Sequence, residues 1–142
     1  VYGPAGRPDM SVFRFVQWIR EGRPVLVFGD GSQSRDFTFV SDIARGTVAA
    51  LAPLGFGVIN LGGDAPHSIA ELIELIEEQT GRVAAVENQP MHRADVTATW
   101  ADISTARELL AWEPRVAFAE GVAESVAWYE ANRSWAKDVE TR

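Results

Sequence analysis

The stretch VFGDGSQSRDFTFVSD, residues 27–42, decides how the first part of this chain folds. Residues 25–28 form a short apolar run of β-branched and aromatic side chains, and residues 35–40 alternate so that two phenylalanines share one face. Both patterns predict strands. The loop 29–34 between them is polar and contains two glycines. We therefore expect the two strands to pair as a hairpin with a long turn.

Arg35 stands at the entrance of the second predicted strand, directly after this loop. The small side chains of the loop leave the backbone open to a flat or charged group. A guanidinium placed there can form paired hydrogen bonds to phosphate oxygens, and each such charge-assisted bond contributes about 1.5–3 kcal/mol. The residues alone leave a second interpretation open, in which Arg35 pairs with a local carboxylate on a surface hairpin.

The loop contains part of a dinucleotide-binding pattern, because Gly29 and Gly31 have the spacing of its first two glycines. The third glycine position holds Ser34, and a strand rather than a helix is predicted after it. That pattern needs a helix N-terminus to receive the pyrophosphate, so the sequence argues against it.

Helical and extended patterns alternate along the rest of the chain. The expected helices cover residues 10–21, 41–51, 69–80, 102–110 and 118–132, and two further strands cover residues 57–61 and 83–86. Asp9 is expected to cap the first helix, and Ser68 forms a capping box with Glu71 at the third. The sequence thus predicts a single domain, residues 1–142, of mixed α/β class with short strands and about five helices.

The composition excludes several classes of protein. With 46% hydrophobic residues, the 142-residue chain can bury a core, and no window approaches the roughly 18 uncharged apolar residues of a membrane span. The absence of cysteine excludes thiolate metal sites and a cysteine nucleophile, and it suits a reducing, cytoplasmic location. The net charge of −7 argues against nucleic acid or an anionic membrane as partner. An anionic ligand must therefore be held by a few local arginines.

Several segments, taken in order, carry a resemblance to a known family: VYGP, RPD, VFGDGSQSRDFTFVSDIARG, VINLGG, the helix capped by Ser68, and DVTATWADISTARELLAWEP. Together they resemble the C-terminal part of the extended short-chain dehydrogenases/reductases. The nearest members are NAD-dependent nucleotide-sugar epimerases of the UDP-glucuronate and UDP-glucose 4-epimerase type. The resemblance extends to about Trp128 and implies the small substrate-binding domain. Because the chain begins at Val1 rather than methionine, we expect the N-terminal Rossmann half to be missing.

In that family, the Rossmann half carries the glycine-rich NAD site and a Tyr-x-x-x-Lys pair. The tyrosine takes the proton from the sugar 4-hydroxyl as a hydride passes to NAD. The only tyrosine followed by a base four residues later is Tyr129, with Arg133, and it stands in the wrong place. The resemblance therefore implies an NAD-dependent epimerase as the parent protein, whereas we expect this chain alone to bind no cofactor and to catalyse nothing.

Two alternatives to the epimerase stay open. One is the same part of a nucleotide-sugar 4,6-dehydratase, decarboxylase or reductase, since these differ from epimerases mainly beside the catalytic tyrosine. The other is a binding or assembly module without catalysis.

The resemblance also assigns substrate-binding roles and a ligand. Val27 and Phe28 would lie beside the base, partly through backbone groups, and Arg35 would contact the diphosphate. The implied ligand is a UDP-sugar or a related nucleotide sugar. Family members bury much surface between their halves, so we expect this part alone to expose apolar area that a second copy could cover, giving a homo-oligomer.

A second arginine is implied in the loop before TWAD. Arg93 is the candidate, and Asp95 would face the ribose or hold an arginine. Relatives commonly read R-x-G-D or Q-P-G-D there, whereas this chain reads HRAD at 92–95. His92 is therefore an alternative occupant of the arginine position.

Overall fold

The computed structural model describes residues 1–53, 55–91 and 96–141. The helices in this part of the chain are α1 (Ser11–Glu21), α2 (Val40–Ala49), α3 (Ile69–Thr80), α4 (Ser104–Leu110) and α5 (Phe118–Ala136). The strands are β1 (Val25–Phe28), β2 (Ser34–Arg35), β3 (His67–Ser68) and β4 (Val86–Gln89). The predicted mixed α/β class, with about five helices and short strands, is confirmed.

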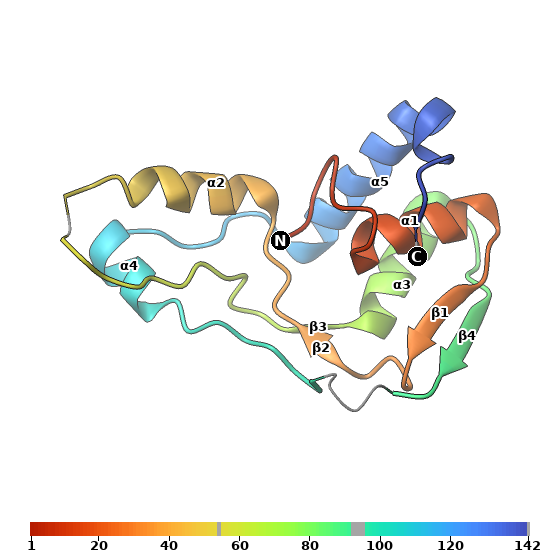
Figure 1. The fold of residues 1–142 in the computed structure, drawn as a ribbon, viewed down its shortest axis with the longest axis horizontal. Coiled ribbons are helices and arrows are strands. Elements are labelled where there is room, and N and C mark those ends of the chain that lie inside the picture. The colour runs from red at the N-terminus through yellow and green to blue at the C-terminus, as the bar shows by residue number, and fades with distance from the viewer. Residues whose placement is uncertain (54, 92–95, 142) are drawn as a thin grey trace.

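The elements form a larger lobe and a narrower arm (Figure 1). In the lobe, α1, α3 and α5 pack against one another with β1 and β4 beside them, and in the arm α2 packs against α4. The buried side chains follow the same division. The core of the lobe includes Leu72 and Val122, whereas Ile103 and Trp112 belong to a separate small core in the arm.

The predicted hairpin between β1 and β2 is wrong. β1 pairs in parallel with β4, and β2 pairs antiparallel with β3. The cause lies in the loop between β1 and β2, which is bound to the start of α3. The amide of Ile69 donates to the carbonyl oxygen of Gln33 (3.1 Å), and the amide of Ala70 donates to that of Gly31 (3.0 Å). The loop therefore carries the chain away from β1 toward β3.

Residues 57–61 were predicted as a strand and do not form one. Leu61 packs on α2 at Gly46, where any larger side chain would collide with it. None of the backbone hydrogen bonds found in the described part of the chain joins 57–61 to a neighbouring strand. A strand needs a partner for its amide and carbonyl groups, so the apolar pattern alone did not suffice. The strand predicted over 83–86 lies further along the chain, as β4.

The predicted helix caps are confirmed at α3 and wrong at α1. The Ser68 hydroxyl accepts a hydrogen bond from the amide of Glu71 (3.0 Å), as a capping box requires. The Glu71 carboxylate lies 2.8 Å from Nδ1 of His67. No side chain caps α1, because the carboxylate of Asp9 accepts a hydrogen bond from the Arg7 guanidinium instead (2.6 Å).

The buried carboxylate of Asp42 joins α2 to the segment that leads from α4 to α5. It accepts hydrogen bonds from the amides of Arg115 (2.9 Å) and Val116 (3.0 Å) and from Arg45 Nη2 (2.6 Å). The Asp42 carbonyl oxygen accepts a further bond from the indole of Trp112 (2.9 Å). Burial acts to raise the pKa of Asp42, but the hydrogen bonds outweigh burial and hold this pKa below its usual range.

A second polar cluster joins α1 to α5. The Glu21 carboxylate accepts hydrogen bonds from Nε and Nη2 of Arg133 (2.8 and 2.9 Å) and from the hydroxyl of Tyr129 (3.0 Å). The bonds from Arg133 lower the pKa of Glu21 to about 2, against the opposing effect of burial.

Among the described residues, no helix combines the length and apolar character needed to cross a bilayer.

Replacing Asp42 with alanine is expected to lower the free energy of unfolding by about 2–4 kcal/mol, because two buried amides and a guanidinium lose their acceptor. Urea denaturation measures the loss. Asp9→Ala is the control, since its pair with Arg7 is exposed and screened by water, so its loss is expected to change the free energy of unfolding far less. Equal losses in the two variants would contradict the role given to Asp42.

Glu21 is expected to make the free energy of unfolding depend on pH. Folding lowers its pKa from 4.5 to about 2, so its stabilising effect is complete above pH 4.5 and is lost as the pH falls toward 2. We expect Glu21→Gln to cost roughly 1–2 kcal/mol at pH 7. The difference from wild type should narrow between pH 5 and pH 2.5 in urea titrations. A constant difference over that range would show that the charge of Glu21 is not involved.

Candidate functional site

The Gln33 side chain bridges the two ends of the loop between β1 and β2. This side chain is only 6% exposed, and its Nε2 donates to the carbonyl oxygen of Phe28 (2.6 Å). Gly29 and Gly31 have φ angles of 86° and 84°, which glycine adopts without strain and other residues rarely adopt. The loop thus has a defined path, and it delivers Arg35 to β2.

β2 is short but is held on both sides. On one side it pairs with β3, with Arg35 opposite His67. On the other side the Ser34 amide donates to the carbonyl oxygen of Thr97 (2.9 Å), and the Thr99 amide donates to that of Ser34 (3.2 Å). The partly buried guanidinium of Arg35 donates from Nη1 to the Ser34 carbonyl oxygen (2.8 Å). The backbone of Arg35 is therefore held by β2 and its neighbours, and its guanidinium is held by the Ser34 carbonyl oxygen.

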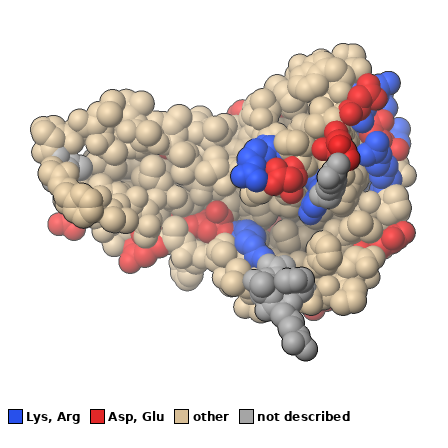
Figure 2. Space-filling model, viewed as in Figure 1, with Lys and Arg blue, Asp and Glu red and all other residues tan. Residues whose placement is uncertain are grey.

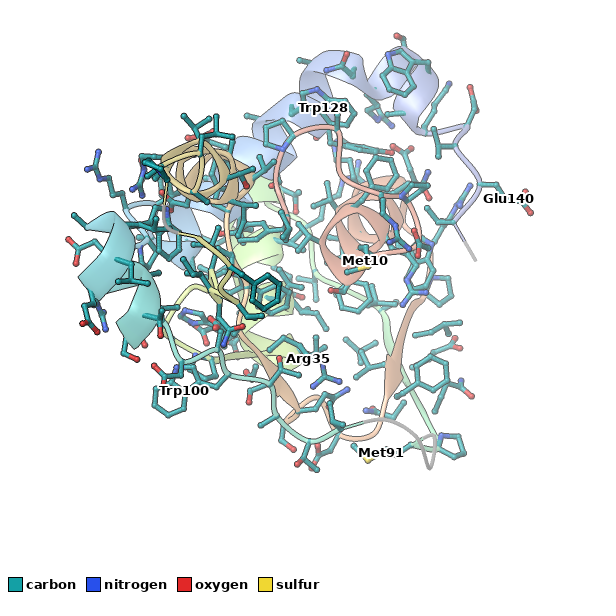
Figure 3. The ribbon with its side chains drawn as sticks, turned by 60° about the vertical axis from the view of Figure 1, so that its left-hand side comes forward. Met10, Arg35, Met91, Trp100, Trp128 and Glu140 are labelled. Carbon is teal, nitrogen blue, oxygen red and sulfur yellow. The ribbon has the colours of Figure 1, made fainter. Side chains whose placement is uncertain are left out.

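A cavity of about 340 Å³ opens between α1, β1 and β2. Val27, Phe28 and Arg35 all line it, so the structure brings these three predicted residues together. Figure 3 shows Arg35 between Met10, just before α1, and Met91, which follows β4. An apolar wall beside a guanidinium suits a ligand that joins a flat ring to an anionic group.

Arg93 and Asp95, and the alternative His92, lie outside the described residues. Their roles therefore stay predictions. The described chain on either side of them leads to this region: β4 pairs with β1 before the segment, and Thr97 bonds to β2 after it.

Asp36 follows Arg35 directly, and a regular strand would turn its side chain to the other face, but Asp36 also lines the cavity. Strand alternation does not continue past Arg35, because β2 ends there. One carboxylate oxygen of Asp36 accepts a hydrogen bond from the amide of Ala101 (2.9 Å). The carboxylate also lies so close to Gly62 and Gly63 that a side chain at either glycine would collide with it. No local pattern in the sequence signals this approach.

Arg14 of α1 is a second cation in the cavity wall that sequence reasoning missed. It lies in a run where the other residues from Val12 to Ile19 are buried. In the sequence, the signal that could have identified Arg14 was a charged residue within a mostly apolar helical run.

Two residues with potential for acid–base chemistry lie outside this cavity. Tyr129 is buried, its hydroxyl donates to Glu21, and burial raises its pKa. His67 lies beside Glu71 and stacks on Phe118, with ring centroids 4.2 Å apart. Within residues 1–53, 55–91 and 96–141, no group of three or more histidines and carboxylates could hold a metal ion.

Known proteins are similar to this chain in sequence and in fold. Residues 2–125 match the family described as GDP-mannose 4,6 dehydratase. The UDP-glucuronate 4-epimerase of Thermodesulfobacterium geofontis is 53% identical over 140 residues, which are 98% of this chain and 43% of that protein.

Two solved structures show the same fold. The UDP-glucuronic acid 4-epimerase of Bacillus cereus, in complex with UDP-glucuronic acid and NAD, has a TM-score of 0.87 and 38% identity, over 92% of this chain and 43% of that one. The epimerase Mth375 of Methanothermobacter thermautotrophicus has a TM-score of 0.91 and 33% identity, over 99% of this chain and 44% of that one.

The chain thus spans less than half the length of these relatives. The family match covers most of the chain, and the similarity extends from sequence to fold. The predicted resemblance is confirmed: the chain belongs to the extended short-chain dehydrogenase/reductase family of NAD-dependent epimerases and dehydratases, and it corresponds to their C-terminal part.

Proposed function

We propose that this chain is the nucleotide-sugar-binding part of an NAD-dependent UDP-sugar 4-epimerase. The observation that carries the proposal is that β1 and Arg35 meet around one cavity. The apolar wall at Val27 and Phe28 would take the uracil ring, and the guanidinium of Arg35 would take the diphosphate. The relatives whose names include UDP-glucuronate or a UDP-glucuronic acid complex support this ligand class.

Electrostatics explain why a local cation is needed. The chain carries a net charge of −7, so a diphosphate would be repelled unless a cation stands at contact distance. Arg35 fulfils this requirement from a position fixed by backbone hydrogen bonds. We further propose that Arg93 adds a second cation and that Asp95 faces the ribose or holds an arginine. The same net charge fits neither nucleic acid nor an anionic membrane as partner, and we propose a cytoplasmic location.

A firm grip on the nucleotide suits epimerisation. A 4-keto sugar has to rotate within the site without dissociating. Binding energy is therefore best placed on the part of the ligand that does not react. A 4,6-dehydratase would grip the nucleotide in the same way, and the matched family carries that description. Analysis of the product of the longer protein separates the two: a dehydrated sugar would eliminate the epimerase.

We infer that the glycine loop between β1 and β2 is not an NAD site. The glycine loop 29–33 leads into β2 rather than into a helix, and its carbonyl groups at Gly31 and Gln33 accept hydrogen bonds from the amides of Ala70 and Ile69 at the start of α3. A dinucleotide cradle would need such amides for the pyrophosphate. We propose that NAD and the catalytic tyrosine belong to the part of the relatives outside the matched region, and that this chain alone binds UDP-sugar without turning it over.

The arm exposes several large apolar side chains, which we call its apolar face: Val48, Leu51, Phe56 and Val58. Phe56 is fully exposed and Leu51 is 82% exposed. Figure 2 shows most of the arm without lysine, arginine, aspartate or glutamate on the side in view. Such a surface is costly in water, so we propose that a second copy of the chain covers it when the chain is alone.

Arg35→Ala is expected to weaken UDP binding about 10-fold or more, because charge-assisted hydrogen bonds to phosphate are lost. Isothermal titration calorimetry of the 142-residue chain measures this, with Arg82→Ala as a control at an exposed arginine outside the cavity. The proposal fails if wild type shows no binding at millimolar UDP, or if both variants bind like wild type.

Leu51→Glu combined with Phe56→Glu is expected to reduce self-association of the chain, because charge on the apolar face opposes burial there. Sedimentation velocity across a concentration series measures the change. Val83→Glu is the control, since Val83 is 90% exposed but lies outside the arm. A wild-type chain that stays monomeric at high concentration would refute the proposed second copy.

A further inference from the structure

Residues 137–141, which we call the strap, turn back after α5 and lie against α1 (Figure 1). The side chain of Gln17 holds them there. Gln17 is 0% exposed, and its Nε2 donates to the carbonyl oxygens of Ala136 (3.0 Å) and Val139 (2.8 Å). Its Oε1 accepts a hydrogen bond from the hydroxyl of Thr141 (2.6 Å). A buried amide that bonds through both of its polar atoms gives the strap a defined place on α1.

Trp18 is the second point at which the strap meets α1. It is 7% exposed, and its Nε1 donates to the hydroxyl of Thr141 (3.0 Å). The guanidinium carbon of Arg14 stands over the same ring, 4.9 Å from its centroid, and 6.0 Å from the centroid of Phe15. Cation–π attraction favours this placement. The indole of Trp18 therefore binds the strap at its edge and Arg14 on its face.

α1 also supplies one wall of the cavity beside Arg35. Ser11, Arg14 and Phe15 line it, whereas Trp18 and the strap are not among the described residues that do. A change in the strap would therefore reach a ligand in the cavity through α1 and not by direct contact.

The strap is attached to α1 by few side chains. Lys137, Asp138 and Glu140 are exposed, and Val139 packs partly buried against the core of the lobe. A segment of this kind opens locally at a smaller cost in free energy than the whole fold does. The strap thus has a docked and an open state, and the open state removes the hydrogen bond from Trp18.

We propose that docking of the strap and binding of a ligand in the cavity are energetically coupled through α1. The docked strap fixes the indole of Trp18, and the indole fixes the part of the cavity wall that Arg14 forms. The inference rests on the proposed function and adds to it a segment outside the cavity that sets the affinity. Thr141 is then a positioning residue, since it acts through Trp18. Such coupling is reciprocal, so the ligand strengthens docking by the factor by which docking strengthens binding.

Thr141→Val tests the coupling, because valine has a similar volume but removes the hydroxyl that bonds to Gln17 and Trp18. Isothermal titration calorimetry of the 142-residue chain is expected to show UDP affinity about threefold lower or less than that of wild type. Thr141→Ser keeps the hydroxyl and should bind UDP like wild type.

Thr80→Val is the matched control. Thr80 is a partly buried residue at the end of α3, and its hydroxyl donates to the carbonyl oxygen of Ile76 (2.7 Å). The same substitution therefore removes a hydroxyl bond from a helix that also packs on α1, without touching the strap. This variant should bind UDP like wild type.

Three outcomes would overturn the coupling while the proposed function stands. Equal losses of affinity in Thr141→Val and Thr80→Val would trace the effect to overall stability. Unchanged affinity in Thr141→Val would separate the strap from the cavity, and a loss in Thr141→Ser as large as that in Thr141→Val would show that the hydroxyl is not involved. Failure of wild type to bind UDP would overturn the proposed function itself.

A measurement on wild type covers the case in which Thr141→Val does not fold. Hydrogen exchange of the indole N–H of Trp18 is followed by NMR with and without saturating UDP. Because the coupling is reciprocal, UDP is expected to slow this exchange about threefold or more. The indole N–H of Trp112, which donates to the Asp42 carbonyl oxygen in the arm, is the internal control and should exchange at an unchanged rate. Equal slowing at both indoles, or no slowing at Trp18, would contradict the inference.

Discussion

Two backbone hydrogen bonds at the start of α3, from Ile69 and Ala70 to the loop before β2, determine where the cavity beside Arg35 forms. They divert the chain from the hairpin that its strand pattern favours and place Arg35 opposite His67 on β3. β1 is then left to pair with β4, and its apolar side chains line the cavity beside Arg35. The position of one cation thus follows from the anchoring of one loop, with Gln33 closing that loop from within.

Because the chain is acidic, the arginines at the cavity have to be held in place. A cation that moved freely over a surface of net charge −7 would spend its time near carboxylates. Here backbone carbonyl and amide groups fix β2, and aromatic rings restrict Arg14, so both guanidiniums are kept at the cavity. The structure therefore keeps two guanidiniums at one cavity while the net charge of the protein stays negative.

The sequence predicted what depends on local pattern. The helices follow from apolar spacing, and the Ser68 cap follows from capping-box chemistry. The hairpin and the strand at 57–61 were wrong because strand pairing depends on partners that are remote in the chain. For the site, Val27, Phe28 and Arg35 were predicted together and share one cavity, although their roles stay predictions. Arg14 was missed because only the packing of α1 beside β1 brings it to that cavity.

The most direct test of this account is a crystal structure of the chain with UDP bound. The account predicts phosphate oxygens within about 2.7–3.0 Å of the guanidinium of Arg35, and the uracil ring against β1. A diphosphate bound elsewhere on the chain, with Arg35 turned away from it, would contradict the central claim.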